Sequence, residues 1–127
     1  MCLLVYVTMP DEDSGLRLAR RLVEAHLAAG VNLVPGVRSV YRWRGVVHEH
    51  GECLLLAQVA RSALAEARAL IVREHPYEVP CVMAVPLSDG HDPFLQWIAE
   101  NSRPGGGRET TPDAQAPSGI SAVRRGP

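Results

Sequence analysis

The polar residues with the clearest chemical potential lie in one short segment, residues 75–80, which reads His-Pro-Tyr-Glu-Val-Pro. The imidazole of His75, the phenol of Tyr77 and the carboxylate of Glu78 could each meet a metal ion, a small ligand or a partner protein. The two prolines hold their own φ near about −65° and bias the preceding residues toward extended backbone, so we expect a rigid joint. Function, or the assembly that creates it, is expected at this joint.

Each of these residues also has a structural interpretation. The ring of His75 could donate to a carbonyl and hold the end of a helix, where an imidazolium would also suit the helix dipole. This interpretation is favoured over metal ligation. Tyr77 and Glu78 could form the wall of a ligand cleft, or they could tie two subunits together; the sequence leaves both open.

A second group of donors lies at His48 and His50, which are two positions apart and therefore on one face of an extended strand. Glu52 continues that face, so the three side chains could chelate zinc, nickel or copper at the surface. A solvated polar face is the favoured alternative. Tyr41 and Trp43 could stack on a ligand, but large aromatic side chains on an extended arm more often anchor an oligomer interface.

The three cysteines are odd in number and show no CxxC spacing, which favours free thiols in a reducing cytoplasm. Cys53 and Cys81 occupy apolar strand patterns and are expected to be small core residues. Cys2 is expected near a frayed, solvent-accessible end. His26 lies beside an apolar helical stripe and is expected to be packed rather than to bind a ligand.

Composition restricts the class of protein. The 127 residues suit one domain, 46% of them are hydrophobic, and the formal net charge is −1, so nucleic-acid binding is not expected. All thirteen basic residues are arginine, which excludes any lysine chemistry. No apolar run approaches the roughly 20 residues that span a bilayer, and the first residues do not resemble a signal peptide. A cytoplasmic protein without a membrane partner is therefore expected.

The first half of the chain predicts a strand, a helix and a long hairpin. Residues 3–8 form a near-continuous apolar run, typical of a strand that is covered on both faces. A helix with a single apolar stripe should follow, capped by Asp11 or Ser14 and ended by Gly30 in the left-handed region. Residues 31–60 should then form two strands joined by a turn at Arg44-Gly45.

That hairpin carries a further expectation. Pro35-Gly36 should bend or bulge its first strand. Its strands should cover residues 31–43 and 46–60. Both are longer than the strands of most globular proteins, which have about 5–6 residues. A single domain of this size would leave the tip of such an arm unsupported, so a partner chain is expected to cover it.

The second half predicts a helix, a strand and a short helix. Ser62 should cap the second helix and Pro76 should end it, and residues 80–86 should form a buried strand. Asp92 should be the N-cap and Pro93 the first residue of the last helix. The order βαββαβ predicts an α+β, ferredoxin-like split βαβ sandwich, in which a four-stranded antiparallel sheet has two helices on one face. The other face should be buried against another subunit.

The domain should comprise residues 1–103. Residues 104–127 are rich in Gly, Pro, Ser and Thr, and we expect them to form a mobile tail.

Five short motifs in this order resemble the CutA divalent-cation-tolerance proteins, over residues 3 to about 103. These motifs are Tyr-Val-Thr-Met-Pro at 6–10, Leu-Ala-Ala-Gly-Val-Asn-Leu-Val-Pro at 27–35, Ser-Val-Tyr-Arg-Trp-Arg-Gly at 39–45, the joint at 75–80, and Phe-Leu-Gln-Trp-Ile at 94–98. The resemblance implies a homotrimer assembled through the long hairpins, with an architecture like that of PII-type signalling proteins. It also implies a role in tolerance of copper and other divalent cations, with copper or another divalent cation as the implied ligand.

The resemblance carries over only part of a metal site. Some bacterial members are assigned a copper site made of a cysteine in the first strand and two consecutive histidines at the end of the second helix. The matching positions are Val7, Glu74 and His75, so only His75 keeps a donor of the same kind.

No catalytic motif accompanies these features. The sequence holds no GxSxG, P-loop or HExxH pattern, and the family has no established catalytic activity, so we expect no enzyme. Two hypotheses stay open: a trimeric metal-responsive protein, and a trimeric signalling or scaffold module that binds a small metabolite or partner protein between subunits.

Overall fold

The structure, a computed structural model, describes residues 1–105. Along the chain lie β1 (Cys2–Met9), α1 (Glu12–Glu24), β2 (Gly30–Trp43), β3 (Val46–Ala60), a 3-10 turn (Arg61–Ala63), α2 (Leu64–Glu74), β4 (Val82–Pro86) and α3 (Asp92–Asn101). The four strands form one antiparallel sheet in the order β2-β3-β1-β4. This arrangement confirms the predicted ferredoxin-like split βαβ fold. Apart from its first two residues, the predicted tail at 104–127 lies outside the described residues.

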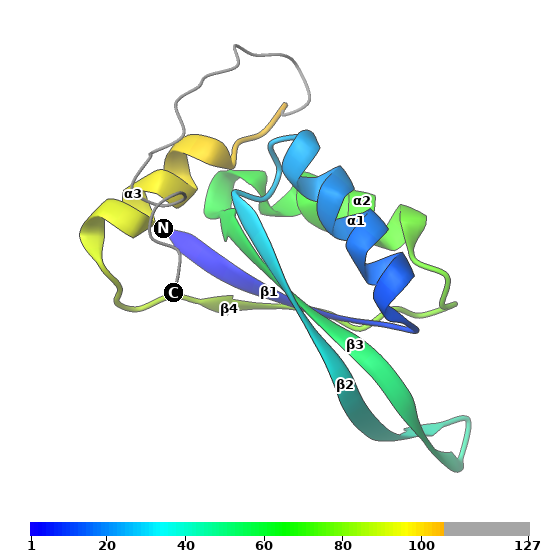
Figure 1. The fold of residues 1–127 in the computed structure, drawn as a ribbon. Helices are drawn as coiled ribbons and strands as arrows, with labels where there is room; N and C mark the ends of the chain where they lie inside the picture. Colours follow the sequence, from blue (N-terminus) through cyan, green and yellow to red (C-terminus); the bar gives the residue numbers. More distant parts are fainter. Residues whose placement is uncertain (106–127) are drawn as a thin grey trace.

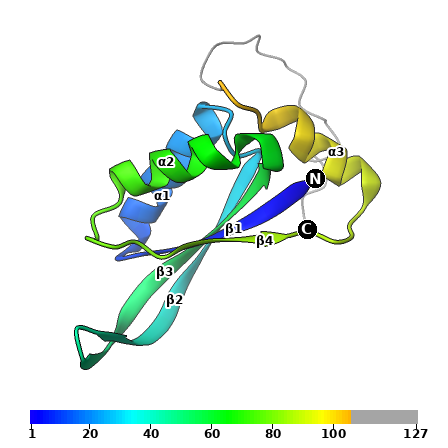
Figure 2. The ribbon, with the colours of Figure 1, turned by 180° about the vertical axis from the view of Figure 1, so that it is seen from behind.

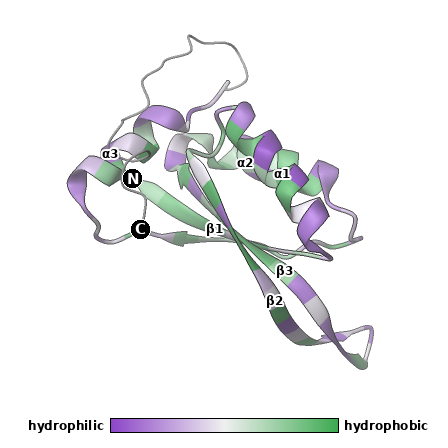
Figure 3. Cartoon of the chain, in the orientation of Figure 1, coloured by the Kyte–Doolittle hydropathy of each residue, from purple (hydrophilic) through white to green (hydrophobic). Residues whose placement is uncertain are grey.

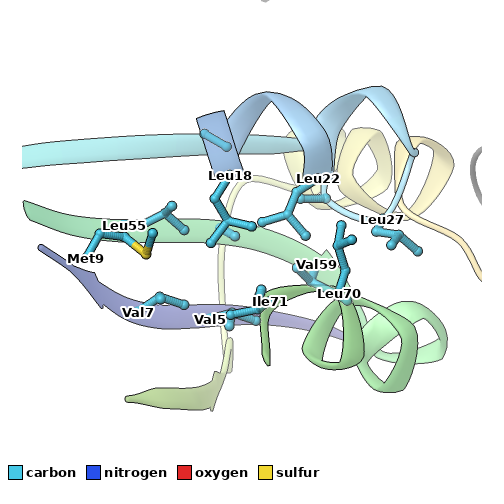
Figure 4. Close-up of a cluster of buried hydrophobic side chains, with 14 of the residues drawn as sticks. Val5, Val7, Met9, Leu18, Leu22, Leu27, Leu55, Val59, Leu70 and Ile71 are labelled. Atoms are coloured by element: carbon cyan, nitrogen blue, oxygen red, sulfur yellow. The ribbon is translucent and has the colours of Figure 1, made fainter. Parts of the chain in front are cut away.

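Helices α1 and α2 lie on one side of the sheet, as the two opposite views show (Figures 1 and 2), whereas α3 packs at the end of the sheet against Cys2, which belongs to the other face. The main core fills the space between that sheet face and helices α1 and α2 (Figure 4). Apolar residues run along β1, whereas the helices carry polar residues between their apolar positions (Figure 3). A smaller cluster joins Ile98 of α3 to Cys2 and Ala29 at the far end of the sheet.

The opposite sheet face is apolar, and among the described helices only α3 covers it, at the end near Cys2. The register places Leu4, Tyr6, Leu54 and Leu56 side by side on this face, where all four are half-buried. Three exposed apolar residues extend it toward the edge strands: Val34, Met83 and Val85.

The long hairpin has the predicted shape. Strands β2 and β3 pair from Gly30 and Gln58 out to Trp43 and Val46, with one register shift between Val34 and Val37, so the bulge at Pro35-Gly36 is confirmed. Arg44 and Gly45 form the turn with φ of 52° and 80°, which suits the twist of a tight hairpin. Beyond the bulge the hairpin extends past the rest of the sheet as an arm, residues 37–52 (Figure 1).

The start of α1 follows the prediction, but its end does not. Asp11 caps α1 as expected, because its Oδ1 accepts the Ser14 N–H at 2.7 Å. The predicted stop at Gly30 is wrong: α1 ends at Glu24, and His26 takes the left-handed conformation, with φ of 60°. The Leu27 N–H bonds to the Leu22 carbonyl and the His26 N–H to the Val23 carbonyl, which together form a Schellman motif.

The other two helix starts also differ from the prediction. Ser62 does not cap α2, because the chain enters that helix through the 3-10 turn and Ala63, without a side-chain hydrogen bond. The last helix begins at Asp92 itself, and His91 takes the N-cap position.

The cysteines follow the expectations only in part. Cys53 is buried in the main core, and Cys81 is only partly buried. Cys2 is buried rather than accessible, because α3 covers the start of β1 and the Leu95 carbonyl lies 3.6 Å from its Sγ.

Candidate functional site

His75, the first residue of the joint, has both ring nitrogens engaged within this chain. It follows the last residue of α2 and takes extended backbone, which turns the chain out of the helix as expected before a proline. Its Nε2–H donates to the Thr8 carbonyl at 2.8 Å, and its Nδ1 accepts the Tyr77 N–H at 3.1 Å. An imidazole that donates at one nitrogen and accepts at the other is the neutral form. With its side chain buried, His75 ties the joint to the end of β1.

Tyr77 reaches from the joint to the base of the arm. Its ring lies 4.8 Å from that of His75, and its hydroxyl donates to Glu52 Oε2 at 2.5 Å. Burial, and then the hydrogen bond to the Glu52 carboxylate, raise the pKa of the Tyr77 phenol above its ordinary value of 10. The phenol therefore remains a hydrogen-bond donor across the physiological pH range.

Glu52 is the residue of this site that the sequence did not identify correctly. The alternation of β3 placed it on a solvated face with His48 and His50, yet only 8% of it is exposed. The joint passes the end of β1, and its Tyr77 covers Glu52. These two residues are 25 positions apart in the sequence. The only sequence signal for the burial of Glu52 was its position, as a polar residue at the base of a long hairpin in a chain that also holds the constrained joint with Tyr77.

Glu78 reaches the tip of the arm. Its carboxylate lies 3.0 Å from Arg44 Nη2 in the hairpin turn, and the guanidinium carbon of Arg44 lies 5.1 Å from the centre of the Trp43 ring. Both charged side chains are about two-thirds exposed, at 68% for Arg44 and 67% for Glu78. An exposed pair of this kind contributes about 0–1 kcal/mol to stability.

The two histidines of the arm lie around Tyr41. His48 is directly opposite Tyr41 in the register, and their rings stack at 5.5 Å with an angle of 18°. The Tyr41 hydroxyl lies 3.2 Å from His50 Nε2. Despite these contacts, Tyr41 and Trp43 remain 40% and 38% exposed.

The arrangement does not fit a resident metal ion. The positions that match the copper site of some family members hold a fully buried Val7, a Glu74 that pairs with Arg21 at 2.6 Å, and the doubly bonded His75. Nowhere in residues 1–105 do three or more His, Cys, Asp or Glu side chains gather so that they could hold a metal ion. A metal at His75 would have to replace one of its two hydrogen bonds.

We call β1, β4, the helices and the inner parts of β2 and β3 the body of the protein. A cleft of about 340 Å³ lies where the arm leaves this body. Its walls come from the start of α1, the bulge of β2 and the facing part of β3. The lining residues are Pro10, Asp11, Glu12, Pro35, Gly36, Val37, Arg38, Gly51, Glu52 and Cys53. Burial is the main cause that raises the pKa of the Cys53 thiol, so this thiol is a poor nucleophile at neutral pH.

The predicted site residues therefore fall into two groups. His75, Tyr77 and Glu78 are brought together at the joint, and each contacts another part of the chain. Tyr41 and Trp43 remain on an exposed arm.

Of the helices between residues 1 and 105, none combines the length and apolar character needed to cross a membrane.

The family model for the CutA1 divalent ion tolerance protein matches residues 3–101. The divalent-cation tolerance protein CutA of Thermus thermophilus is 41% identical over 98 residues, which cover 77% of this chain and 95% of that protein. The chloroplastic protein CutA of Arabidopsis thaliana is 40% identical over 101 residues, which cover 80% of this chain but only 56% of that protein. This chain thus spans little more than half the length of the plant relative.

Solved structures show the same relationship. The divalent cation tolerance protein from Thermus thermophilus superposes with a TM-score of 0.78 at 40% identity, over 80% of this chain and 99% of that one. The protein from Nostoc that is described as PII-like CutA superposes with a TM-score of 0.74 at 28% identity, over 80% of this chain and 97% of that one.

Proposed function

Since the chain belongs to the CutA1 divalent ion tolerance family, we propose that it acts in the cytoplasm as a non-catalytic homotrimer in the response to divalent cations, copper among them. In this proposal the protein binds metal weakly or acts on metal tolerance indirectly. The observation that carries it is the state of His75, whose two nitrogens are both used by hydrogen bonds within the chain.

Two features support a trimer. The sheet face opposite α1 and α2 is apolar and, beyond its end under α3, leaves Val34, Met83 and Val85 exposed; the arm holds Tyr41 and Trp43 away from the core (Figure 1). Apolar faces of this extent on soluble proteins commonly mark contacts with another chain. Sedimentation equilibrium of the tag-free protein should give about three times the 13.8 kDa of one chain. A monomer at micromolar concentration would contradict the trimer.

Calorimetric titration with Cu(II) and Zn(II) tests the metal part of the proposal. We expect micromolar or weaker binding that is unchanged in His75→Ala, because within residues 1–105 His75 belongs to no group of three or more donor side chains. The matched variant His48→Ala/His50→Ala removes the exposed imidazole pair of the arm and should account for the weak binding that remains. Tight binding that disappears in His75→Ala would contradict this proposal.

The cleft favours a second candidate function, a PII-like module that binds a small metabolite. Its volume of about 340 Å³ lies at the lower end of the range of small-molecule sites, roughly 300–1,000 Å³. A thermal-shift screen of metabolites would identify a ligand by a raised melting temperature. Gly51→Val is the steric control: the Cβ would have only the Val37 carbonyl oxygen nearby, at 3.9 Å, so a side chain there would occupy the cleft.

A further inference from the structure

The joint contacts the rest of the chain at three separated places. His75 bonds to the carbonyl of Thr8 near the end of β1. Tyr77 bonds to Glu52 at the base of the arm, and Glu78 pairs with Arg44 at its tip. The joint therefore links the body to both ends of the arm, although it belongs to neither strand of the hairpin.

These contacts differ in strength because they differ in exposure. Glu52 is a buried carboxylate, and among the described residues its only side-chain hydrogen bond comes from the Tyr77 hydroxyl. Removing that donor would leave a buried charge without a partner, which is far more costly than the loss of an exposed bond. The Arg44–Glu78 pair is exposed and contributes little by comparison.

The arm has few other supports. Every residue from 40 to 51 is exposed, so within the described chain no apolar packing holds this part against the body. A two-stranded hairpin alone is marginally stable in water. At its base the arm connects through the bulge, where Gly36 has φ of 77°. The direction of the arm must therefore come from the bulge and from the contacts of the joint.

We propose that the joint is a brace for the arm, and that Tyr77 and Glu52 are the positioning residues that set how the arm meets a second copy of this chain. His75 contributes to this brace because its hydrogen bond to Thr8 fixes the joint to β1. This structural role replaces the metal ligation that the resemblance to some family members suggested for His75. The assembly part rests on the proposed trimer, in which the second copy contacts the aromatic side chains of the arm; the brace itself is a property of one chain.

Tyr77→Phe tests the brace, because it removes one oxygen atom and keeps the ring beside His75. Amide hydrogen exchange at residues 40–49 should accelerate by about tenfold or more, since the lost bond involves a charged group, whereas exchange at residues 54–59 should change much less. The dissociation constant of the trimer should rise by a similar factor. Arg38→Gln is the matched control, since it removes the exposed Arg38–Glu49 pair from the same arm and should leave both quantities nearly unchanged.

The double variant Tyr77→Phe/Glu52→Leu separates a brace from general destabilisation. Replacing both partners removes the unpaired buried charge, so global stability should recover relative to Tyr77→Phe. The arm should nevertheless exchange as fast as in Tyr77→Phe, because the bond is absent from both variants. Recovery of arm protection together with global stability would overturn the brace.

The remaining outcomes are equally decisive. Unchanged arm exchange in Tyr77→Phe overturns the proposal. If that variant does not fold, Glu52→Gln gives the same comparison, because it keeps an acceptor oxygen but loses the charge that strengthens the bond; unchanged arm exchange in that variant would also overturn the brace. If the wild-type protein is a monomer, the trimer fails, while faster arm exchange in Tyr77→Phe would still support the brace.

Discussion

The two halves of the β2–β3 ladder use the same backbone pairing but differ in what their side chains meet. In the inner half, Cys53, Leu55, Ala57 and Val59 alternate as buried residues beneath α1 and α2. In the outer half, residues 46–51 of β3 are all exposed, although each of them still has a cross-strand partner in β2. Hydrogen-bonded pairing therefore continues where burial stops.

This difference shows that the two halves depend on different partners. The inner half is stabilised by burial within its own chain, and that burial is the dominant favourable term in folding. The outer half gains little from burial in one chain, so its stability depends on the joint and, under our proposal, on a second copy. A change in the inner half should therefore affect folding, and a change in the outer half should affect assembly.

The largest effect is expected from Leu55→Ala in the inner half. Leu55 is fully buried in the main core, and truncation of such a leucine typically costs about 2–5 kcal/mol because it leaves a cavity. Urea unfolding followed by circular dichroism would measure the loss. Val47→Ala, in the arm of the same strand and 58% exposed, is the matched control and should stay within about 0.5 kcal/mol. Equal costs for the two variants would remove the distinction between the halves.

A smaller effect, on a different quantity, is expected from Trp43→Ala. Buried aromatic anchors at interfaces typically contribute about 2 kcal/mol or more to association, so the trimer should dissociate at concentrations where the wild type remains intact. Sedimentation equilibrium would measure the change, and unfolding of the dissociated chain should be nearly unaffected. If Val47→Ala on the opposite face of the arm weakened the trimer equally, the aromatic face would lose its proposed role.

Most of the fold could be predicted from local patterns because each strand carries a strong signal. The apolar run at 3–8, the turn at Arg44-Gly45 and the bulge at Pro35-Gly36 all depend on residues close together in sequence, and all were confirmed. The error at the end of α1 arose because another residue met the same conformational requirement. His26 adopted the left-handed conformation that Gly30 was expected to supply, and the backbone bonds of the Schellman motif join Leu27 to Leu22, both of which lie in the main core.

The site could be predicted less well because its contacts are long-range. Sequence indicated that His75 and Tyr77 would lie on a constrained joint, but it could not show which strand the joint would cross. The 67-residue separation between His75 and Thr8, and the burial of Glu52, follow from the path of the joint past the end of β1. The alternation of polar and apolar residues along β3 carries no information about that path.

The smallest expected effect concerns the N-cap of α1, and it acts on the body alone. The backbone hydrogen bond from Ser14, followed by the bond to its side chain, lowers the pKa of Asp11 below its ordinary value of 3.8. A carboxyl whose pKa is lower in the folded protein contributes stability above its unfolded pKa and loses it as the pH falls through the folded pKa. Asp11→Asn keeps an acceptor oxygen for the cap but does not titrate.

The melting temperature of the wild type should therefore exceed that of Asp11→Asn near neutral pH, and the difference should shrink as the pH is lowered below about 4, the range in which an ordinary aspartate protonates. All other ionisable groups are common to the two proteins and cancel from the difference. Because Asp11 lies on the body, this difference should appear in unfolding and not in the dissociation constant of the trimer. A matching pH-dependent change in dissociation would mean that the start of α1 and the arm respond as one unit through the cleft between them.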